Sequence, residues 1–107
     1  MEPLLVLTNV PDVAGAEELA HALIESRAAA CVNVLAACRS IYRWQGAVET
    51  ADEIPLLIKT TAENYPRVEA IVREHHLYAV PELIAVPITH GLPAYLDWVA
   101  KETEKHD

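Results

Sequence analysis

The stretch that decides the fold runs from Ala30 to Thr61 and reads ACVNVLAACRSIYRWQGAVETADEIPLLIKTT. It consists of two long arms of mostly β-forming residues around a short turn at Trp44-Gln45-Gly46. A typical strand has about 5–6 residues, whereas each arm here is long enough to exceed ten. At ~3.3 Å per residue such an arm spans ~40 Å or more, further than the core of so small a chain. We therefore expect part of the hairpin to leave its own domain and to offer an edge to another chain.

The composition indicates one acidic globular domain spanning 1–107. The chain is 52% hydrophobic and has only 3 glycines, which argues against disorder. No apolar run approaches ~18 residues, so we expect no membrane span. The start of the chain lacks the features of a signal peptide, which favours the cytosol. A net charge of −8 with scattered basic residues argues against binding to nucleic acid or to anionic membranes.

Apolar residues recur along both arms, as in strands with one buried face. The first arm is predicted to present one shared face formed by Val32, Val34, Ala36, Cys38, Tyr42 and Trp44. The second arm does likewise with Val48, Ile54, Leu56 and Ile58. Pro55 has no N–H, so it must lie at an edge, at a bulge or with its nitrogen facing outward. Cys31 and Cys38 are an odd number of residues apart and are expected on opposite faces, at ~23 Å too distant for a disulfide.

The segments outside the hairpin alternate between short strands and amphipathic helices. We expect a strand over 4–8, a helix over 13–27, a helix starting at Thr61 or Asn64, a strand over 83–89 and a helix from Pro93. Asp12 is the expected N-cap of the first helix. The order β-α-β-β-α-β plus a terminal helix is typical of the α+β, ferredoxin-like split βαβ unit, with helices on one face of an antiparallel sheet. The other face then needs a cover, and a partner subunit is the simplest one.

Five short motifs occur in one order along almost the whole chain. They are Ala29-Ala30-Cys31-Val32-Asn33, Ser40-Ile41-Tyr42-Arg43-Trp44-Gln45-Gly46, Leu57-Ile58-Lys59-Thr60-Thr61, His75-His76-Leu77-Tyr78 with Val80-Pro81-Glu82-Leu83, and Tyr95-Leu96-Asp97-Trp98. In these motifs the chain resembles the CutA family of divalent-cation tolerance proteins. The resemblance implies a ferredoxin-like fold, a homotrimer whose hairpins wrap neighbouring subunits as in PII-type signalling proteins, and an association with copper and other divalent cations.

The adjacent residues His75 and His76 are the candidate metal ligands. Imidazole nitrogens suit copper and zinc, and the resemblance implies that this pair is the copper-associated position. Neighbouring residues on a helix point ~100° apart, so the pair chelates one ion easily only if the helix ends between them or if another subunit adds ligands. The alternative is structural: His75 packs in the core, and His76 favours the carboxyl end of the helix dipole.

Two positions depart from the pattern that the resemblance implies. Thr8 stands where some relatives have a cysteine ligand, and a hydroxyl is a far poorer ligand for soft copper than a thiolate. This departure argues against copper(I) binding in particular. Leu77 replaces the proline of the His-Pro-Tyr motif, which loosens the geometry expected after the helix.

A second candidate site comprises Trp44, Lys59, Tyr78 and Glu82, which the resemblance implies gather near a cleft between subunits. A Lys-Glu pair beside aromatic walls is suited to hold a small polar ligand, but it could equally be an ion pair that seals a trimer. Glu82 is also a candidate metal ligand, or a carboxylate that orients His76.

No nucleophile motif, phosphate-binding loop or metalloprotease motif occurs in the sequence, so we expect no catalytic activity. The leading hypothesis is a cytosolic homotrimer that binds divalent metal and serves in metal tolerance or homeostasis. The alternatives are a PII-like small-molecule sensor or trimeric interaction scaffold, and an enzyme with Glu82 or His76 as general base.

Overall fold

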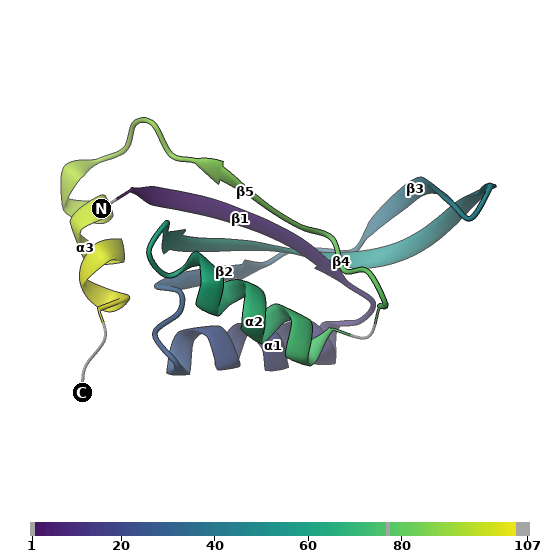
Figure 1. Cartoon of the computed structure of the whole chain (residues 1–107), viewed down its shortest axis with the longest axis horizontal. Coiled ribbons are helices and arrows are strands. Elements are labelled where there is room, and N and C mark those ends of the chain that lie inside the picture. Colours follow the sequence, from purple (N-terminus) through teal and green to yellow (C-terminus); the bar gives the residue numbers. More distant parts are fainter. Residues whose placement is uncertain (1, 77, 105–107) are drawn as a thin grey trace.

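The chain folds into an antiparallel sheet with three helices (Figure 1), in a computed structural model that describes residues 2–76 and 78–104. The elements are β1 (Pro3–Val10), α1 (Val13–Glu25), β2 (Cys31–Val34), β3 (Cys38–Trp44), β4 (Ala47–Thr61), α2 (Tyr65–His75), β5 (Leu83–Pro87) and α3 (Pro93–Glu102). The strand order is β2-β4-β1-β5, and β3 pairs with the far half of β4. Within the described ranges, every helix is too short or too polar to cross a membrane.

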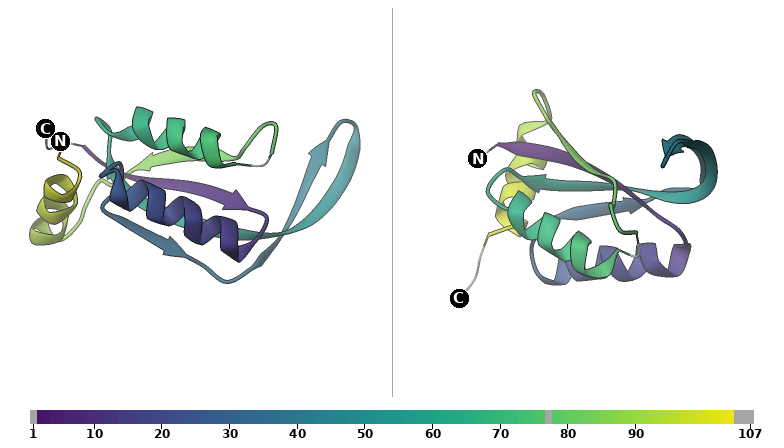
Figure 2. Two further views of the ribbon diagram at one scale, coloured as in Figure 1. Left: turned by 90° about the horizontal axis from the view of Figure 1, so that it is seen from below. Right: turned by 45° about the vertical axis from the view of Figure 1, so that its right-hand side comes forward.

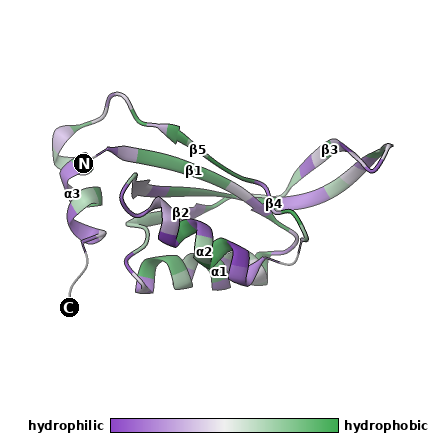
Figure 3. Cartoon of the chain, viewed as in Figure 1, coloured by the Kyte–Doolittle hydropathy of each residue, from purple (hydrophilic) through white to green (hydrophobic). Residues whose placement is uncertain are grey.

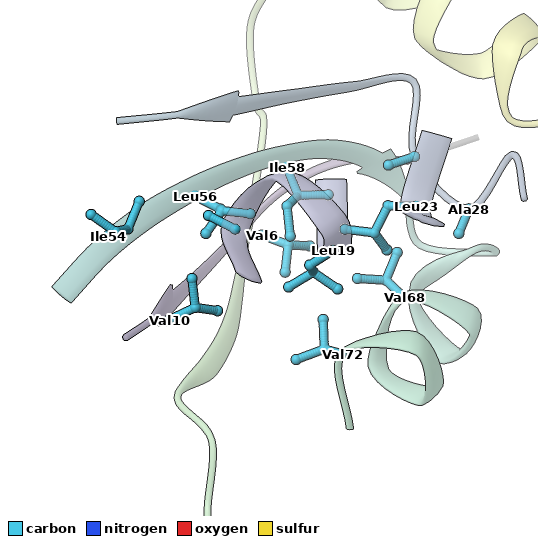
Figure 4. Packing of buried hydrophobic residues seen from close by; sticks show 12 residues of the cluster. Val6, Val10, Leu19, Leu23, Ala28, Ile54, Leu56, Ile58, Val68 and Val72 are labelled. Atoms are coloured by element: carbon cyan, nitrogen blue, oxygen red, sulfur yellow. The ribbon is translucent and has the colours of Figure 1, made fainter. Parts of the chain in front are cut away.

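The core lies between one face of the sheet and the pair α1 and α2, which run side by side beneath it (Figures 1 and 2). Alternate residues of a strand point to opposite faces, so the sheet contributes even-numbered residues to this core. The buried side chains are Val6, Val10, Ile54, Leu56 and Ile58 from the sheet and Leu19, Leu23, Val68 and Val72 from the helices (Figure 4). The periodicities of the sequence thus set which face of each element is buried.

The opposite face of the sheet carries apolar side chains, and none of the helices within residues 2–76 and 78–104 covers it. Ile84 and Val86 of β5 lie there beside β1 and are 53% and 42% exposed. α3 instead packs at the end of the sheet that is remote from the hairpin (Figure 2). Its Val99 is fully buried, while Tyr95 and Trp98 remain 40% and 42% exposed.

The ends of α1 are fixed by side chains. Asp12 is the N-cap as predicted, because its carboxylate accepts a hydrogen bond of 2.7 Å from the Gly15 amide. The helix ends at Glu25, two residues before the predicted end, since Arg27 adopts a left-handed backbone with φ 63°. The guanidinium of Arg67 on α2 then donates to the carbonyl oxygens of Ser26 and Arg27.

The first arm of the hairpin is not the single strand that we expected. β2 pairs Val34 with Leu56, and β3 starts with Cys38 opposite Glu53. Three residues, 35–37, therefore stand opposite two, 54–55, which is a β-bulge. The bulge accommodates Pro55: the Pro55 carbonyl accepts from the Leu35 amide at 3.0 Å, so the missing N–H of Pro55 would have faced this same arm.

The bulge overturns the prediction that the apolar residues of the first arm share one face. Paired residues of an antiparallel ladder lie on the same side, so Val32 and Val34 lie on the side of Ile58 and Leu56, toward the helices. Beyond the bulge, Tyr42 and Trp44 pair with Glu49 and Ala47 and lie on the opposite side. The first arm thus has no single apolar face.

The same shift puts both cysteines on one side of the ladder instead of on opposite faces. Cys31 pairs with Lys59 and Cys38 pairs with Glu53. Both are free thiols, as predicted. Their partners are six positions apart on β4, which corresponds to ~20 Å along the strand.

The second arm, β4, is one continuous strand of 15 residues. Its far half and β3 project beyond the body of the molecule, and Figure 3 shows that this projecting part of β4 is largely hydrophilic. Gln45 and Gly46 form the turn with φ values of 50° and 82°, as a two-residue type I′ hairpin loop requires. The prediction that part of the hairpin leaves the domain is confirmed.

Candidate functional site

The two candidate metal ligands lie at the carboxyl end of α2. The helix ends at His75, and His76 is the C-cap with an extended backbone, φ −86° and ψ 138°. Both side chains are half-buried. The helix therefore ends between the two histidines, which is the condition under which adjacent imidazoles can turn toward one ion.

Each imidazole is oriented by a main-chain carbonyl. Nδ1 of His75 lies 3.0 Å from the Ile71 oxygen, and Nε2 of His76 lies 2.7 Å from the Asn9 oxygen. Because a carbonyl only accepts, each of these ring nitrogens carries the proton and donates. The remaining nitrogens, Nε2 of His75 and Nδ1 of His76, keep their lone pairs in the neutral rings. Nδ1 of His76 accepts the Tyr78 amide at 3.2 Å.

The end of β1 connects this pair to Glu82. The Asn9 side-chain amide donates to the Glu82 carboxylate at 3.1 Å, and the Thr8 hydroxyl donates to the Glu82 carbonyl at 2.6 Å. Thr8 is 1% exposed, so its hydroxyl has a structural partner at the position where the resemblance implies a cysteine. Leu77, the other departure, lies outside the described residues.

The described parts of the chain contain no group of three or more His, Cys, Asp or Glu side chains arranged to hold a metal ion. His75 and His76 are adjacent, and Glu82 is linked to His76 only indirectly, through the side chain and the carbonyl of Asn9. The assignment of His75 and His76 as metal ligands stays a prediction.

Three of the four residues predicted for the second site meet at one cavity. A cavity of about 750 Å³ lies between the hairpin and the segment 78–82, and it is lined by Ser40, Ile41, Tyr42, Trp44, Glu53, Tyr78, Ala79, Val80 and Glu82. Lys59 is not among these residues. Its ammonium group instead contacts Asn33 Oδ1 and lies 4.0 Å from the Cys31 sulfur.

The sequence reasoning missed Glu53 and Tyr42 as members of this cavity. Glu53 is only 8% exposed although it follows the polar part of β4. Burial raises the pKa of the Tyr78 phenol, and the nearby Glu53 carboxylate raises it further. The available signal was Pro55, because a bulge is one of the placements that a missing donor allows, and the bulge turns Tyr42 to the side of Glu53.

Comparisons with known proteins identify the family of this chain. A model of the family described as "CutA1 divalent ion tolerance protein" matches residues 4–102. The chain is 46% identical over 99 residues to the divalent-cation tolerance protein CutA of Thermus thermophilus, and the match covers 92% of this chain and 96% of that protein.

Solved structures of relatives have the same fold. CutA from Xylella fastidiosa superposes with a TM-score of 0.94 at 40% identity, and the match covers 97% of this chain and 100% of that one. A protein from Archaeoglobus fulgidus, described as the periplasmic divalent cation tolerance protein CutA, gives a TM-score of 0.92 at 33% identity, with 95% and 99% covered. On the match to residues 4–102 and on these identities, the chain belongs to the CutA1 divalent ion tolerance protein family.

Proposed function

We propose that this protein binds divalent metal ions, copper among them, and contributes to metal tolerance without catalysing a reaction. In this proposal the whole chain, 1–107, acts as one domain in a cytosolic homotrimer. The family's description and the names of the relatives supply the link to divalent cations. One relative is described as periplasmic, so the compartment of this chain is for experiment to decide.

The orientation of the two imidazoles is the observation that supports the metal site best. Histidines that bind metals usually donate their other ring N–H to a carbonyl or carboxylate, which fixes the tautomer and the ring. His75 and His76 both have this arrangement, with Ile71 and Asn9 as the acceptors. The proposed ligand atoms are Nε2 of His75 and Nδ1 of His76, and metal binding must displace the Tyr78 amide from the latter.

The donor set favours a divalent ion over copper(I). Imidazole suits copper(II) and zinc(II), and the Glu82 carboxylate is linked to His76 through Asn9, whose side chain donates to Glu82 and whose carbonyl accepts from His76. A thiolate would be needed for tight copper(I) binding, and Thr8 supplies a hydroxyl that is already bonded to the Glu82 carbonyl. We therefore expect weak, divalent-selective binding.

Calorimetric titration of copper(II) and zinc(II) into the purified protein tests this site. The double variant His75→Ala/His76→Ala should lose the binding heat, whereas His90→Ala should bind as the wild type does. His90 is the matched control because it is an exposed histidine outside the cluster. An unchanged isotherm for the double variant would show that the site is elsewhere.

Two surfaces that a single chain leaves exposed support the trimer: the second face of the sheet and the projecting hairpin. The strand order β2-β4-β1-β5 with α1 and α2 on one face supports the ferredoxin-like interpretation. The other face carries Ile84 and Val86 exposed, and the hairpin projects past the body. Light scattering on a sizing column should give three times the 11.8 kDa chain mass, and a monomer would contradict the proposal.

A second candidate function is that of a small-molecule sensor or trimeric interaction scaffold of the PII type. The cavity between the hairpin and the segment 78–82 supports it, because about 750 Å³ is a common size for a ligand site.

A further inference from the structure

We propose that Tyr78 transmits the state of His76 to the hairpin, so that a divalent ion held by His76 alters the contact between the segment 78–82 and the hairpin. This inference rests on the proposed metal-binding function and names what the bound ion does to the protein. Two contacts of Tyr78 support it, one made by its amide and one by its phenol. Both lie inside one chain, so neither requires the hairpin to be free of neighbouring subunits.

The Tyr78 amide occupies the ring nitrogen of His76 that a metal ion needs. Nε2 of His76 donates to the Asn9 carbonyl at 2.7 Å, so Nδ1 has the only lone pair of the neutral ring. The Tyr78 N–H donates to that lone pair at 3.2 Å. One lone pair serves one partner at a time, so this hydrogen bond and a metal ion on Nδ1 exclude each other. His76 therefore has two states that differ in what Tyr78 can contact.

Tyr78 cannot stay in place when Nδ1 holds an ion. An imidazole nitrogen binds zinc at ~2.0–2.1 Å, about 1 Å less than the 3.2 Å between Nδ1 of His76 and the Tyr78 nitrogen. No room is left for an ion between these two atoms. The Tyr78 ring also lies against the imidazole, with ring centroids 4.8 Å apart and planes tilted by 48°. The main chain of Tyr78 must therefore move, and its ring moves with it.

The other end of Tyr78 contacts the hairpin. Its side chain lines the cavity together with Tyr42 of β3 and Glu53 of β4. The phenol lies close to the Glu53 carboxylate, which is only 8% exposed. Packed side chains that contact both sites are the physical means by which one site affects another. A displacement of Tyr78 at His76 thus changes its contact with Glu53.

The hairpin is the part of the chain that the proposed trimer packs against neighbouring subunits. Tyr42 pairs with Glu49 in its projecting part, and Glu53 pairs with Cys38 where β3 begins. The effect of an ion on His76 therefore reaches residues at the proposed subunit contact. Such coupling is reciprocal. Hairpin contacts that hold Tyr78 on His76 must weaken metal binding by the same factor by which metal binding weakens those contacts.

Tyrosine amide signals in nuclear magnetic resonance spectra report both ends of this connection. Selective ¹⁵N-tyrosine labelling of the whole chain gives four signals, one from each tyrosine. In metal-free protein, His76→Ala removes the acceptor of the Tyr78 amide, so the signals of Tyr78 and Tyr42 should both shift. The signals of Tyr65 and Tyr95 should not, because neither residue lines the cavity.

The adjacent histidine supplies the matched control. Nδ1 of His75 donates to the Ile71 carbonyl and not to Tyr78, so His75→Ala should leave the Tyr42 signal of metal-free protein in place. Zinc(II), which is diamagnetic, is then titrated into the wild-type protein. The Tyr78 and Tyr42 signals should shift together and saturate at the same zinc concentration as the calorimetric heat.

Tyr78→Ala separates metal binding from its effect on the hairpin. The variant keeps the main-chain N–H but lacks the ring and the phenol that contact the hairpin. Zinc should bind at least about fivefold more tightly, because the hairpin no longer holds this residue on His76, and the Tyr42 signal should no longer respond. Val80→Ala truncates another side chain of the same segment and should keep the wild-type affinity and response. Tyr78→Ala also serves should His76→Ala fail to fold, and circular dichroism verifies the fold of each variant.

An unmoved Tyr42 signal in His76→Ala, or in wild type saturated with zinc, would overturn the role of Tyr78 without bearing on the metal site. So would an equal Tyr42 response in Tyr78→Ala and wild type. Absence of zinc heat would instead contradict the proposed metal site. The metal-free comparison of His76→Ala with His75→Ala then still decides whether Tyr78 connects His76 to the hairpin, so the two failures are distinguishable.

Discussion

The hydroxyl of Thr8 donates a hydrogen bond of 2.6 Å to the main-chain carbonyl of Glu82, 74 positions later in the sequence. This bond fixes the residue before β5 to the carboxyl-terminal part of β1, close to the segment that carries Tyr78. It also gives the hydroxyl at this buried position of the strand a hydrogen-bond partner. Thr8 is thus part of the support of the candidate site.

Replacement of Thr8 by Val should destabilise the protein. The change conserves shape but leaves the Glu82 carbonyl without its donor, which costs ~1–2 kcal/mol in the free energy of unfolding. Urea denaturation measures this cost. Thr50→Val is the matched control, since Thr50 is exposed on β4, and Thr8→Ser should retain the hydrogen bond. Equal stability of Thr8→Val and wild type would contradict this role.

The hairpin turn should respond to two substitutions in opposite directions. Asn is favoured over Gln at the first position of a type I′ turn, so Gln45→Asn should raise the free energy of unfolding by ~0.5 kcal/mol. Gly46 has φ 82°, so Gly46→Ala should lower it by ~1–2 kcal/mol. Thermal melts followed by circular dichroism measure both. A neutral Gly46→Ala would argue against the left-handed turn.

Arg67 should be the most sensitive charged residue of α2. Its guanidinium donates to the Ser26 and Arg27 carbonyls and, at 3.1 Å, to the Asn64 side chain. Arg67→Met leaves the carboxyl end of α1 without these donors and should cost ~1–2 kcal/mol in the free energy of unfolding. Arg73→Met, at an exposed position of the same helix, should cost far less. Comparable losses in the two variants would exclude a specific cap.

Stability should fall at alkaline pH. Burial, with a smaller contribution from neighbouring ionisable groups, raises the pKa values of Tyr65, Tyr78 and Tyr95 above the ordinary value of 10.0. Above pH 10 the unfolded chain therefore loses phenolic protons that the native protein still binds, so the free energy of unfolding decreases as pH rises. Urea midpoints between pH 9 and about 11.5 measure the slope, which should become shallower in Tyr78→Phe. A flat profile would contradict the raised pKa values.

Apart from the division of the first arm into β2 and β3, the sequence alone predicted the elements and their order, because strong periodic patterns and helix caps determine them locally. Asp12 is the clearest case, since a capping residue acts on an amide three positions away. The side chains of the first arm were mispredicted because a single bulge reverses their orientation. Pro55 permitted that bulge among other outcomes, and a choice among them needs the register with β2 and β3.

The sequence could predict candidate site residues that stand together in one motif, but not the distant residues that contact them. The pair His75 and His76 is visible in the sequence, but the carbonyl of Asn9 that orients His76 is 67 positions away. The burial of Glu53 likewise depends on contacts with a distant segment. Tertiary partners of this kind leave no local pattern in the sequence.

The bulge at residues 35–37 lies between two parts of the ladder that are each fixed by their own pairing with β4. Val34 stands opposite Leu56, and Cys38 stands opposite Glu53. Removal of one residue there, such as Ala37, would give an unbroken ladder in which Cys38 still stands opposite Glu53, so Tyr42 and Trp44 would keep their side. The bulge can thus absorb a change of one residue in the length of the arm without moving the aromatic wall of the cavity.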